Sequence, residues 1–119
     1  MATKHLDKSE FLNKVINYEV NPNEWKFLGD KPAVIDFYAE WCGPCKRLSP
    51  VLEELAETYQ DKVDIYKINV DEQEELAQIF GVQSIPTLIF VPLHELPQRA
   101  QGALPKDVLT NAIEELLAK

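Results

Sequence analysis

The spacing of apolar residues along the chain predicts an alternation of strands and helices. The segments Ala33–Tyr38 and Val63–Val70 are short and rich in apolar or β-branched residues, which is typical of strands buried on both faces of a sheet. After Cys45 the apolar residues recur at helical spacing, which predicts an amphipathic helix with one buried face: Leu48, Val51, Leu52, Leu55, Ala56 and Tyr59. A strand, helix and strand in this order predict an α/β fold.

Polar residues at fixed spacing predict where two further helices begin. Asp7 with Glu10 has the pattern of a capping box, which opens a helix that we expect to end near Asn17. Asp71 with Glu74 offers a second capping box, and Gly81 is a stop signal for the helix that would follow it. The intervening segment 18–31 contains turn signals, so we interpret it as a connecting excursion whose Trp25 and Phe27 pack against the core.

The last third of the chain predicts antiparallel strands and a final helix. Thr87–Val91 is a strand by composition, and Gln98–Gln101 is a candidate edge strand. Pro105 suits the first turn of a closing helix. The buried face of that helix is predicted to contain Val108, Leu109, Ala112, Ile113, Leu116 and Leu117.

Length and charge narrow the possible functions. The 119 residues are expected to form one domain, residues 1–119, and 12 basic against 20 acidic residues give a net charge of −8. No basic stripe is present to follow a phosphate backbone, so nucleic acids and anionic membranes are disfavoured as partners. No apolar run approaches the roughly 20 residues of a membrane span. The acidic surface favours a monomer.

The only two cysteines lie in one motif, Trp41-Cys42-Gly43-Pro44-Cys45-Lys46. This spacing at the start of a helix allows a reversible disulfide. The helix N-terminus stabilises a thiolate and lowers the pKa of the Cys42 thiol below its free value of about 8.5, which makes Cys42 the expected nucleophile. Cys45, one turn into the helix, is expected to be more buried and to resolve the mixed disulfide.

The cysteine count also bears on the compartment. A chain whose cysteines all lie in one motif has no disulfide framework of the kind found in small secreted domains, so the cytosol is expected. The segment from Met1 to Asp7 is too polar for a signal peptide. The alternative is an exported, periplasmic protein whose export signal is absent from this sequence.

Two charged residues stand in apolar strands. Asp36 lies in the middle of Ala33–Tyr38, where burial raises the pKa of a carboxyl group and fits it to exchange a proton with Cys45. Lys67 shares the strand face of Val63 and Ile65 and, paired with Asp36 across adjacent strands, would stabilise the buried acid. The alternatives are a solvent-facing Asp36 at a strand end and a surface Lys67 whose stem alone is buried.

Other candidate features have ordinary structural interpretations. Pro86, in Ile85-Pro86-Thr87, suits the first residue of a strand, and most such bonds are trans. Trp41 can cover a reactive thiol or form a docking face, although most tryptophans simply pack. A metal site is the weakest interpretation, because the chain adds only His5, His94 and carboxylates to the cysteines, without ligand spacing. No cofactor is expected.

Together these motifs resemble the thioredoxin family from about Ala33 to the C-terminus. The segment Phe37–Lys46 is similar to the active-site segment of that family, Lys67–Asp71 to its next strand, and Ile85-Pro86-Thr87 to its cis-proline loop. The resemblance implies a thioredoxin fold, with a central mixed β-sheet flanked by helices on both faces.

The resemblance also implies roles for residues at the matching positions. Cys42 would attack, Cys45 would resolve, and the buried pair Asp36 and Lys67 would handle protons. Pro86 would be cis and face the disulfide, keeping metals from the thiols, and Ile85 would offer backbone hydrogen bonds to an extended substrate. The substrate groove would be bordered by Trp41, Gly43, Pro44 and Gly102.

Three departures from the family pattern affect partner choice more than chemistry. Tyr38 stands where well-known members often have a tryptophan, and the ring is retained. The loop Val91–Pro97 has two prolines in place of a glycine-containing turn, which predicts an irregular edge. Pro105 replaces a polar helix cap, and the 18–31 excursion is longer than in compact members.

The expected function is a protein disulfide reductase whose dithiol form reduces substrate disulfides and is recharged by a thioredoxin reductase or an equivalent electron donor. The Gly-Pro pair between the cysteines favours this interpretation, because family members with that pair are typically reductants. The alternatives are an exported thiol oxidase or isomerase, and a thioredoxin-fold binding subunit in which thiol turnover is incidental.

Overall fold

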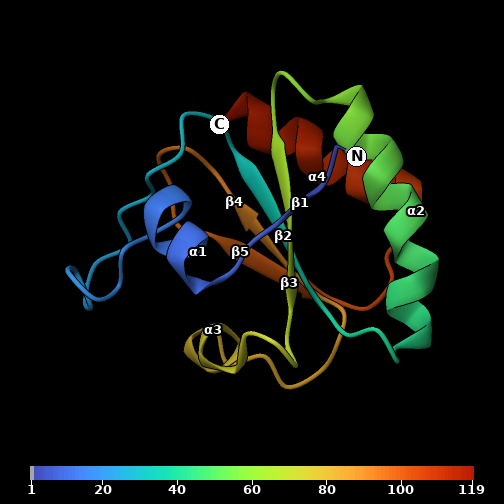
Figure 1. Cartoon of the computed structure of the whole chain (residues 1–119). Helices are drawn as coiled ribbons and strands as arrows, with labels where there is room; N and C mark the ends of the chain where they lie inside the picture. The colour runs from blue at the N-terminus through green and yellow to red at the C-terminus, as the bar shows by residue number, and fades with distance from the viewer. Residues whose placement is uncertain (1) are drawn as a thin grey trace.

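The computed structural model describes residues 2–119, which form five strands and four helices (Figure 1). In chain order they are β1 (Lys4–His5), α1 (Lys8–Lys14), β2 (Ala33–Tyr38), α2 (Gly43–Thr58), β3 (Asp64–Asn69), α3 (Glu74–Ile79), β4 (Thr87–Val91), β5 (Gln98–Gln101) and α4 (Lys106–Ala118). The predicted strands and helices are therefore present, and β1 is an addition.

The strands form one mixed sheet in the order β1-β3-β2-β4-β5. The central strand β2 runs parallel to β3 and antiparallel to β4, and β5 is an antiparallel edge strand. The strand β1 pairs in parallel with β3 through two exposed residues. It was not predicted, because it contains no apolar run. The register places Asp36 beside Lys67 on β3 and beside Leu88 on β4.

Helices cover both faces of the sheet, as Figure 1 shows, with α2 and α4 on one face and α1 and α3 on the other. On the first face Val34 and Ile65 pack with residues of α2 and α4, including Leu52 and Ile113. On the second face Ile35 and Phe37 pack with Phe11 of α1 and Leu76 of α3. The alternation of side chains along β2 therefore sends Asp36 to the α2 face.

The helices depart from the sequence prediction at several residues, and α1 ends at Lys14 rather than near Asn17. The capping box of Asp7 and Glu10 is confirmed for α1, but α3 begins after Gln73 without a side-chain cap, so the prediction for Asp71 and Glu74 is wrong. The side chain of Asn69 satisfies the Asp71 N–H instead, at 2.9 Å. At α4, Pro105 is the N-cap residue rather than the first helical residue, and Val108 is exposed rather than buried.

The excursion between α1 and β2 packs against the core as predicted. Trp25 meets Phe80 edge to face, with ring centroids 6.2 Å apart, and Tyr18 lies against Phe11. The Leu28 N–H donates to the Val15 carbonyl, which closes the excursion onto the end of α1. The excursion therefore extends the core on the α1 and α3 face.

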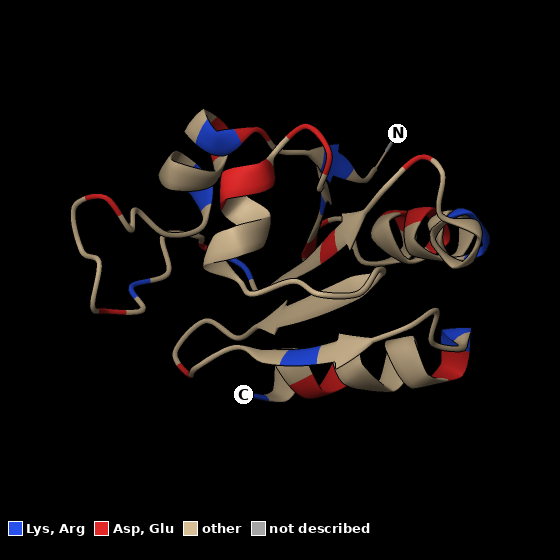
Figure 2. Ribbon diagram, turned by 90° about the horizontal axis from the view of Figure 1, so that it is seen from below, with Lys and Arg blue, Asp and Glu red and all other residues tan. Residues whose placement is uncertain are grey.

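Charged residues lie mainly on the helices and loops (Figure 2). Few charged residues lie inside the sheet. The buried ones on the two central strands are Asp36 on β2 and Asp64 and Lys67 on β3. Within residues 2–119, no helix combines the length and apolar character needed to cross a membrane.

Candidate active site

The cysteine pair lies at the N-terminus of α2, where the chain turns from the end of β2. Cys42 is the N-cap residue and Pro44 lies in the first turn, where a missing N–H has no helical partner to lose. The Cys45 N–H donates to the Cys42 sulfur at 3.2 Å. The predicted position of Cys42 at a helix N-terminus is confirmed, and a negative charge on its sulfur would be stabilised there.

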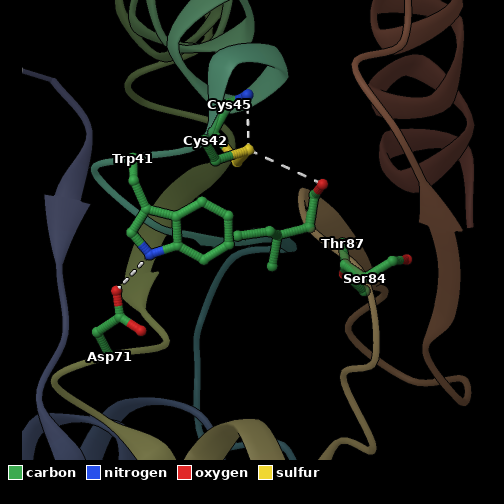
Figure 3. The surroundings of a disulfide bond; sticks show 7 residues. Trp41, Cys42, Cys45, Asp71, Ser84 and Thr87 are labelled. Carbon is green, nitrogen blue, oxygen red and sulfur yellow. Dashed lines mark hydrogen bonds between the residues drawn. A yellow bond between two sulfur atoms is a disulfide. The ribbon is translucent and has the colours of Figure 1, made fainter.

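Cys42 and Cys45 form a disulfide bond, shown in Figure 3. Both residues are buried, with 4% of Cys42 and 3% of Cys45 exposed. The expected difference in burial is therefore absent in this oxidised form. The two sulfurs differ in their surroundings instead, because Cys42 Sγ accepts the backbone hydrogen bond and also faces the loop before β4.

That facing loop contains Ile85 and Pro86, joined by a cis peptide bond. The Ile85 carbonyl oxygen lies 3.9 Å from Cys42 Sγ, and the Pro86 carbonyl accepts a hydrogen bond from the Gly102 N–H at 2.9 Å. Gly102 has a φ of +92°, which suits glycine and lets the chain turn at the end of β5. The structure thus joins Gly102 to Pro86 by a hydrogen bond and confirms the cis bond before Pro86, while Ile85 of the same loop faces Cys42.

Trp41 lies beside the disulfide and is 70% exposed (Figure 3). Its indole Nε1 donates to Asp71 Oδ2 at 2.8 Å, and this bond fixes the large ring at the surface. Gly43 and Pro44 are also exposed. An exposed apolar ring held by a hydrogen bond next to a reactive group suits contact with a partner better than core packing.

Asp36 is completely buried, with 0% of its surface exposed, so the solvent-facing alternative is wrong. Neither carboxylate oxygen has a hydrogen-bond partner among residues 2–119. Burial raises the pKa of Asp36 to about 7, and the charge of Lys67 opposes this rise. The carboxyl group can therefore take up or release a proton near neutral pH, as the apolar sequence around it predicted.

Lys67 is buried beside Asp36 in the strand register, but its ammonium group contacts other groups. Lys67 Nζ donates to Ser49 Oγ on α2 at 3.0 Å and lies 4.4 Å from the centroid of the Tyr38 ring. The expected pairing of Lys67 with Asp36 across adjacent strands is confirmed, because the two residues are partners in the register and the Lys67 charge favours the ionised form of Asp36. Asp36 nevertheless accepts no hydrogen bond from Lys67. The surface alternative is wrong, because only 8% of Lys67 is exposed.

Sequence reasoning missed several groups that support this site. Asp71 holds Trp41, Ser49 holds Lys67, and the Tyr38 hydroxyl lies 3.2 Å from His5 Nδ1. The Ser49 contact had a weak signal, because Ser49 lies four residues after Cys45 and therefore on the same side of the helix. The contacts of His5 and Asp71 depend on tertiary structure and had no local signal.

The described residues contain no group of three or more His, Cys, Asp or Glu side chains arranged to hold a metal ion. His94, one of the few ligand types in the sequence, lines a separate hollow with Trp25 and Phe27. This hollow lies at the opposite end of β4 from the disulfide, because β4 begins at Thr87 beside the cis proline and ends at Val91.

Comparisons with known proteins agree on one family. The family model described as Thioredoxin matches residues 3–115. A thioredoxin of Borreliella burgdorferi is 44% identical over 110 residues, which cover 92% of this chain and 93% of that protein. A thioredoxin of Haemophilus influenzae is 39% identical, with 93% of this chain and 94% of that protein covered.

Solved structures agree with the sequence comparisons. Chloroplastic thioredoxin z, whose structure is described as defining a novel type-specific target recognition, superposes with a TM-score of 0.80 and 25% sequence identity. The match covers 100% of this chain and 97% of that one. The sheet order and the helices on both faces are therefore those of a thioredoxin fold.

Proposed function

The chain belongs to the thioredoxin family and is a protein-disulfide oxidoreductase, and we propose that it works as a general disulfide reductant in which Cys42 attacks and Cys45 resolves. The observation that carries this assignment is the position of Cys42 as N-cap of α2, with its sulfur accepting the Cys45 N–H. A backbone donor and a helix N-terminus both stabilise a thiolate at that atom.

The reaction proceeds by two thiol–disulfide exchanges. The Cys42 thiolate attacks one sulfur of the substrate disulfide, which forms a mixed disulfide and releases the other substrate sulfur as a thiolate. Cys45 then loses its proton and attacks Cys42 Sγ, which forms the Cys42–Cys45 disulfide and releases the second substrate thiolate. Both released thiolates take up protons, so the substrate gains two electrons and two protons.

Asp36 supplies a proton acceptor for the second exchange. Cys45 is buried, so its thiol needs a nearby base when it attacks the mixed disulfide. Asp36 lies on the sheet face covered by α2, and its pKa of about 7 leaves a useful fraction of the carboxylate at neutral pH. Lys67 favours the charged form of this acid through its own positive charge.

The substrate binds as an extended segment across the exposed groove residues. Trp41, Gly43 and Pro44 are exposed on one side of the disulfide, and Ile85 and Gly102 are partly exposed on the other. The backbone of Ile85 offers hydrogen bonds to a peptide, while the exposed ring of Trp41 gives non-specific contact area. Such a site recognises the disulfide and the backbone of the substrate peptide, and it depends little on the substrate's side-chain sequence.

The partners are disulfide-containing proteins and a reductase that returns the pair to the dithiol form. We assign the recharging role to a thioredoxin reductase, the working form to a monomer, and the compartment to the cytosol. The cysteine usage supports the compartment, and the net charge of −8 supports the monomer.

A trapping experiment tests the roles of the two cysteines. Cys45→Ser, incubated with a protein substrate that contains a disulfide, is expected to accumulate a mixed disulfide at Cys42, because the resolving thiol is missing. Cys42→Ser is the matched control and is expected to accumulate none. Non-reducing electrophoresis with mass spectrometry of the linked peptides measures both. Equal trapping by the two variants, or trapping at Cys45 alone, would contradict the assignment.

A further inference from the structure

The positive charge of Lys67 opposes the rise in the Asp36 pKa, but its ammonium group donates no hydrogen bond to the Asp36 carboxyl group. Instead Ser49 Oγ accepts a hydrogen bond from Lys67 Nζ at 3.0 Å, and the Tyr38 ring centroid lies 4.4 Å away. These two groups come from different elements, α2 and β2, and Tyr38 is buried in the cluster around the disulfide. The ammonium position is therefore set by the site rather than by solvent.

The strand register places the side chains of Asp36 and Lys67 next to each other. Asp36 and Lys67 are Cα partners on parallel strands, so their side chains leave the sheet on the same face. A free lysine at this register would lower its energy by approaching the unpartnered carboxylate. Both oxygens of Asp36 nevertheless have no hydrogen-bond partner among residues 2–119. The contacts of Lys67 with Ser49 and Tyr38 compete with that approach.

A small open pocket explains why the ammonium is stable where it lies. Lys67 and Ser49 line this pocket of about 200 Å³ together with Cys45, on the side of β1. Besides Lys67, the titratable and charged groups that face it are His5 from β1, Tyr38 from β2, Glu40 after β2 and Lys46 from α2. Lys67 thus lines an open pocket, while Asp36 is completely buried.

We propose that Ser49 is a positioning residue, which together with the Tyr38 ring holds the Lys67 ammonium away from Asp36 and so keeps the Asp36 carboxyl available for proton exchange with Cys45. The catalytic meaning of this arrangement rests on the proposed function, in which Asp36 accepts the Cys45 proton. The positional claim itself concerns only Ser49, Lys67 and Asp36, and it can be measured without any turnover.

Ser49→Ala is the principal variant. It removes the hydroxyl acceptor and leaves the Tyr38 ring, so the ammonium is expected to move toward the carboxylate and lower the Asp36 pKa by about one unit. Ser49→Thr keeps a hydroxyl at the same position and is the matched control, with an unchanged pKa. Lys67→Met removes the charge and is expected to raise the pKa.

The measurement is a carbon NMR titration of the Asp36 carboxyl group in the oxidised protein, where neither cysteine titrates. A lower pKa in Ser49→Ala with an unchanged pKa in Ser49→Thr supports the proposal. An unchanged or raised pKa in Ser49→Ala overturns it, whether or not the protein reduces disulfides. Each variant is included only if its NMR spectrum is that of a folded protein and its Cys42–Cys45 disulfide is intact.

The pH profile of substrate reduction then tests the link to function. The profile of Ser49→Ala is expected to shift toward lower pH in parallel with its Asp36 pKa, and that of Ser49→Thr to match the unmodified protein. If the Asp36 pKa shifts and the profile does not, the positional claim stands and the role of Asp36 in the proposed mechanism fails. The two failures are therefore distinguishable.

Discussion

Asp36 shows how a single side chain couples folding to chemistry. The residue is fully buried without a hydrogen-bond partner among residues 2–119, an arrangement that costs free energy whenever the carboxyl group is ionised. A protein that needed only a stable strand would have an apolar residue there, like its neighbours Ile35 and Phe37. The cost is understandable if the site uses the group as a proton acceptor.

Replacement of Asp36 by asparagine should stabilise the protein in a pH-dependent way. The pKa of Asp36 is raised from 3.8 to about 7 on folding, so the unfolded carboxyl ionises at lower pH than the folded one. The native protein therefore loses stability as the pH rises from about 4 to about 7, by about 4 kcal/mol in total, and the loss levels off above that range.

Denaturant unfolding at a series of pH values checks this expectation. The free energy of unfolding of Asp36→Asn minus that of the unmodified protein is expected to increase across that window and to be constant above it. A difference that does not change with pH would mean that Asp36 is ordinary in the folded state. Glu40→Gln, which replaces an exposed acid near the same strand, is the control and should show a much smaller change.

The predictability of these residues follows from how local their signals are. Cys42 and Cys45 can be recognised by their spacing, and Asp36 can be recognised by the apolar residues on both sides of it. The position of Lys67 beside Asp36 was predicted, but its contacts with Ser49 and Tyr38 were not, because a strand register gives the neighbour of a Cα atom and not the contacts of a long side chain. Its partner Ser49 comes from α2, which only the packing of that helix on the sheet brings close.

At the scale of elements, helix ends decided by local chemistry were predictable and those decided by tertiary contacts were not. The capping box of Asp7 and Glu10 forms as its spacing predicts. The same spacing at Asp71 and Glu74 fails, because Asn69 occupies the local backbone donors and Asp71 binds Trp41. The strand β1 could not be predicted, because two exposed residues are too few to show an alternation of apolar and polar positions.

The capping box of α1 should contribute measurably to stability. In it the Asp7 side chain accepts from the Glu10 N–H at 2.8 Å, and the Glu10 side chain accepts from the Asp7 N–H at 3.2 Å. Asp7→Ala is expected to lower the free energy of unfolding by about 1 kcal/mol. Asp7→Asn retains a good N-cap and should lose much less.

Urea unfolding of the two variants at neutral pH provides the comparison. Because α1 buries Phe11 against the core, loss of its cap should register in the global transition and not only in local fraying. Equal stability of Asp7→Ala and Asp7→Asn would show that the observed hydrogen bonds contribute nothing net.

At the scale of the whole molecule, the net charge of −8 should influence which substrates react fastest. Figure 2 shows acidic residues spread over the helices and loops, and the excess of acidic over basic residues creates a negative field around the molecule. A disulfide peptide with basic flanks is expected to be reduced several-fold faster than one with acidic flanks at low ionic strength.

Salt provides the internal control for this prediction. The ratio of the two second-order rate constants should approach one as ionic strength rises to about 0.5 M, because screening shortens the range of the field. A neutral peptide with the same disulfide should fall between the two. A preference that survives high salt would instead indicate specific contacts in the groove.

Whether the Cys42–Cys45 pair is a reductant is decided by its equilibrium reduction potential. The pair should be equilibrated with glutathione or dithiothreitol buffers, and the dithiol fraction measured by alkylation and mass spectrometry. We expect a reduction potential of about −270 mV, the value known for thioredoxin. A value above about −180 mV would contradict it, because such a pair oxidises or rearranges thiols, and the exported oxidase or isomerase would then be the better description.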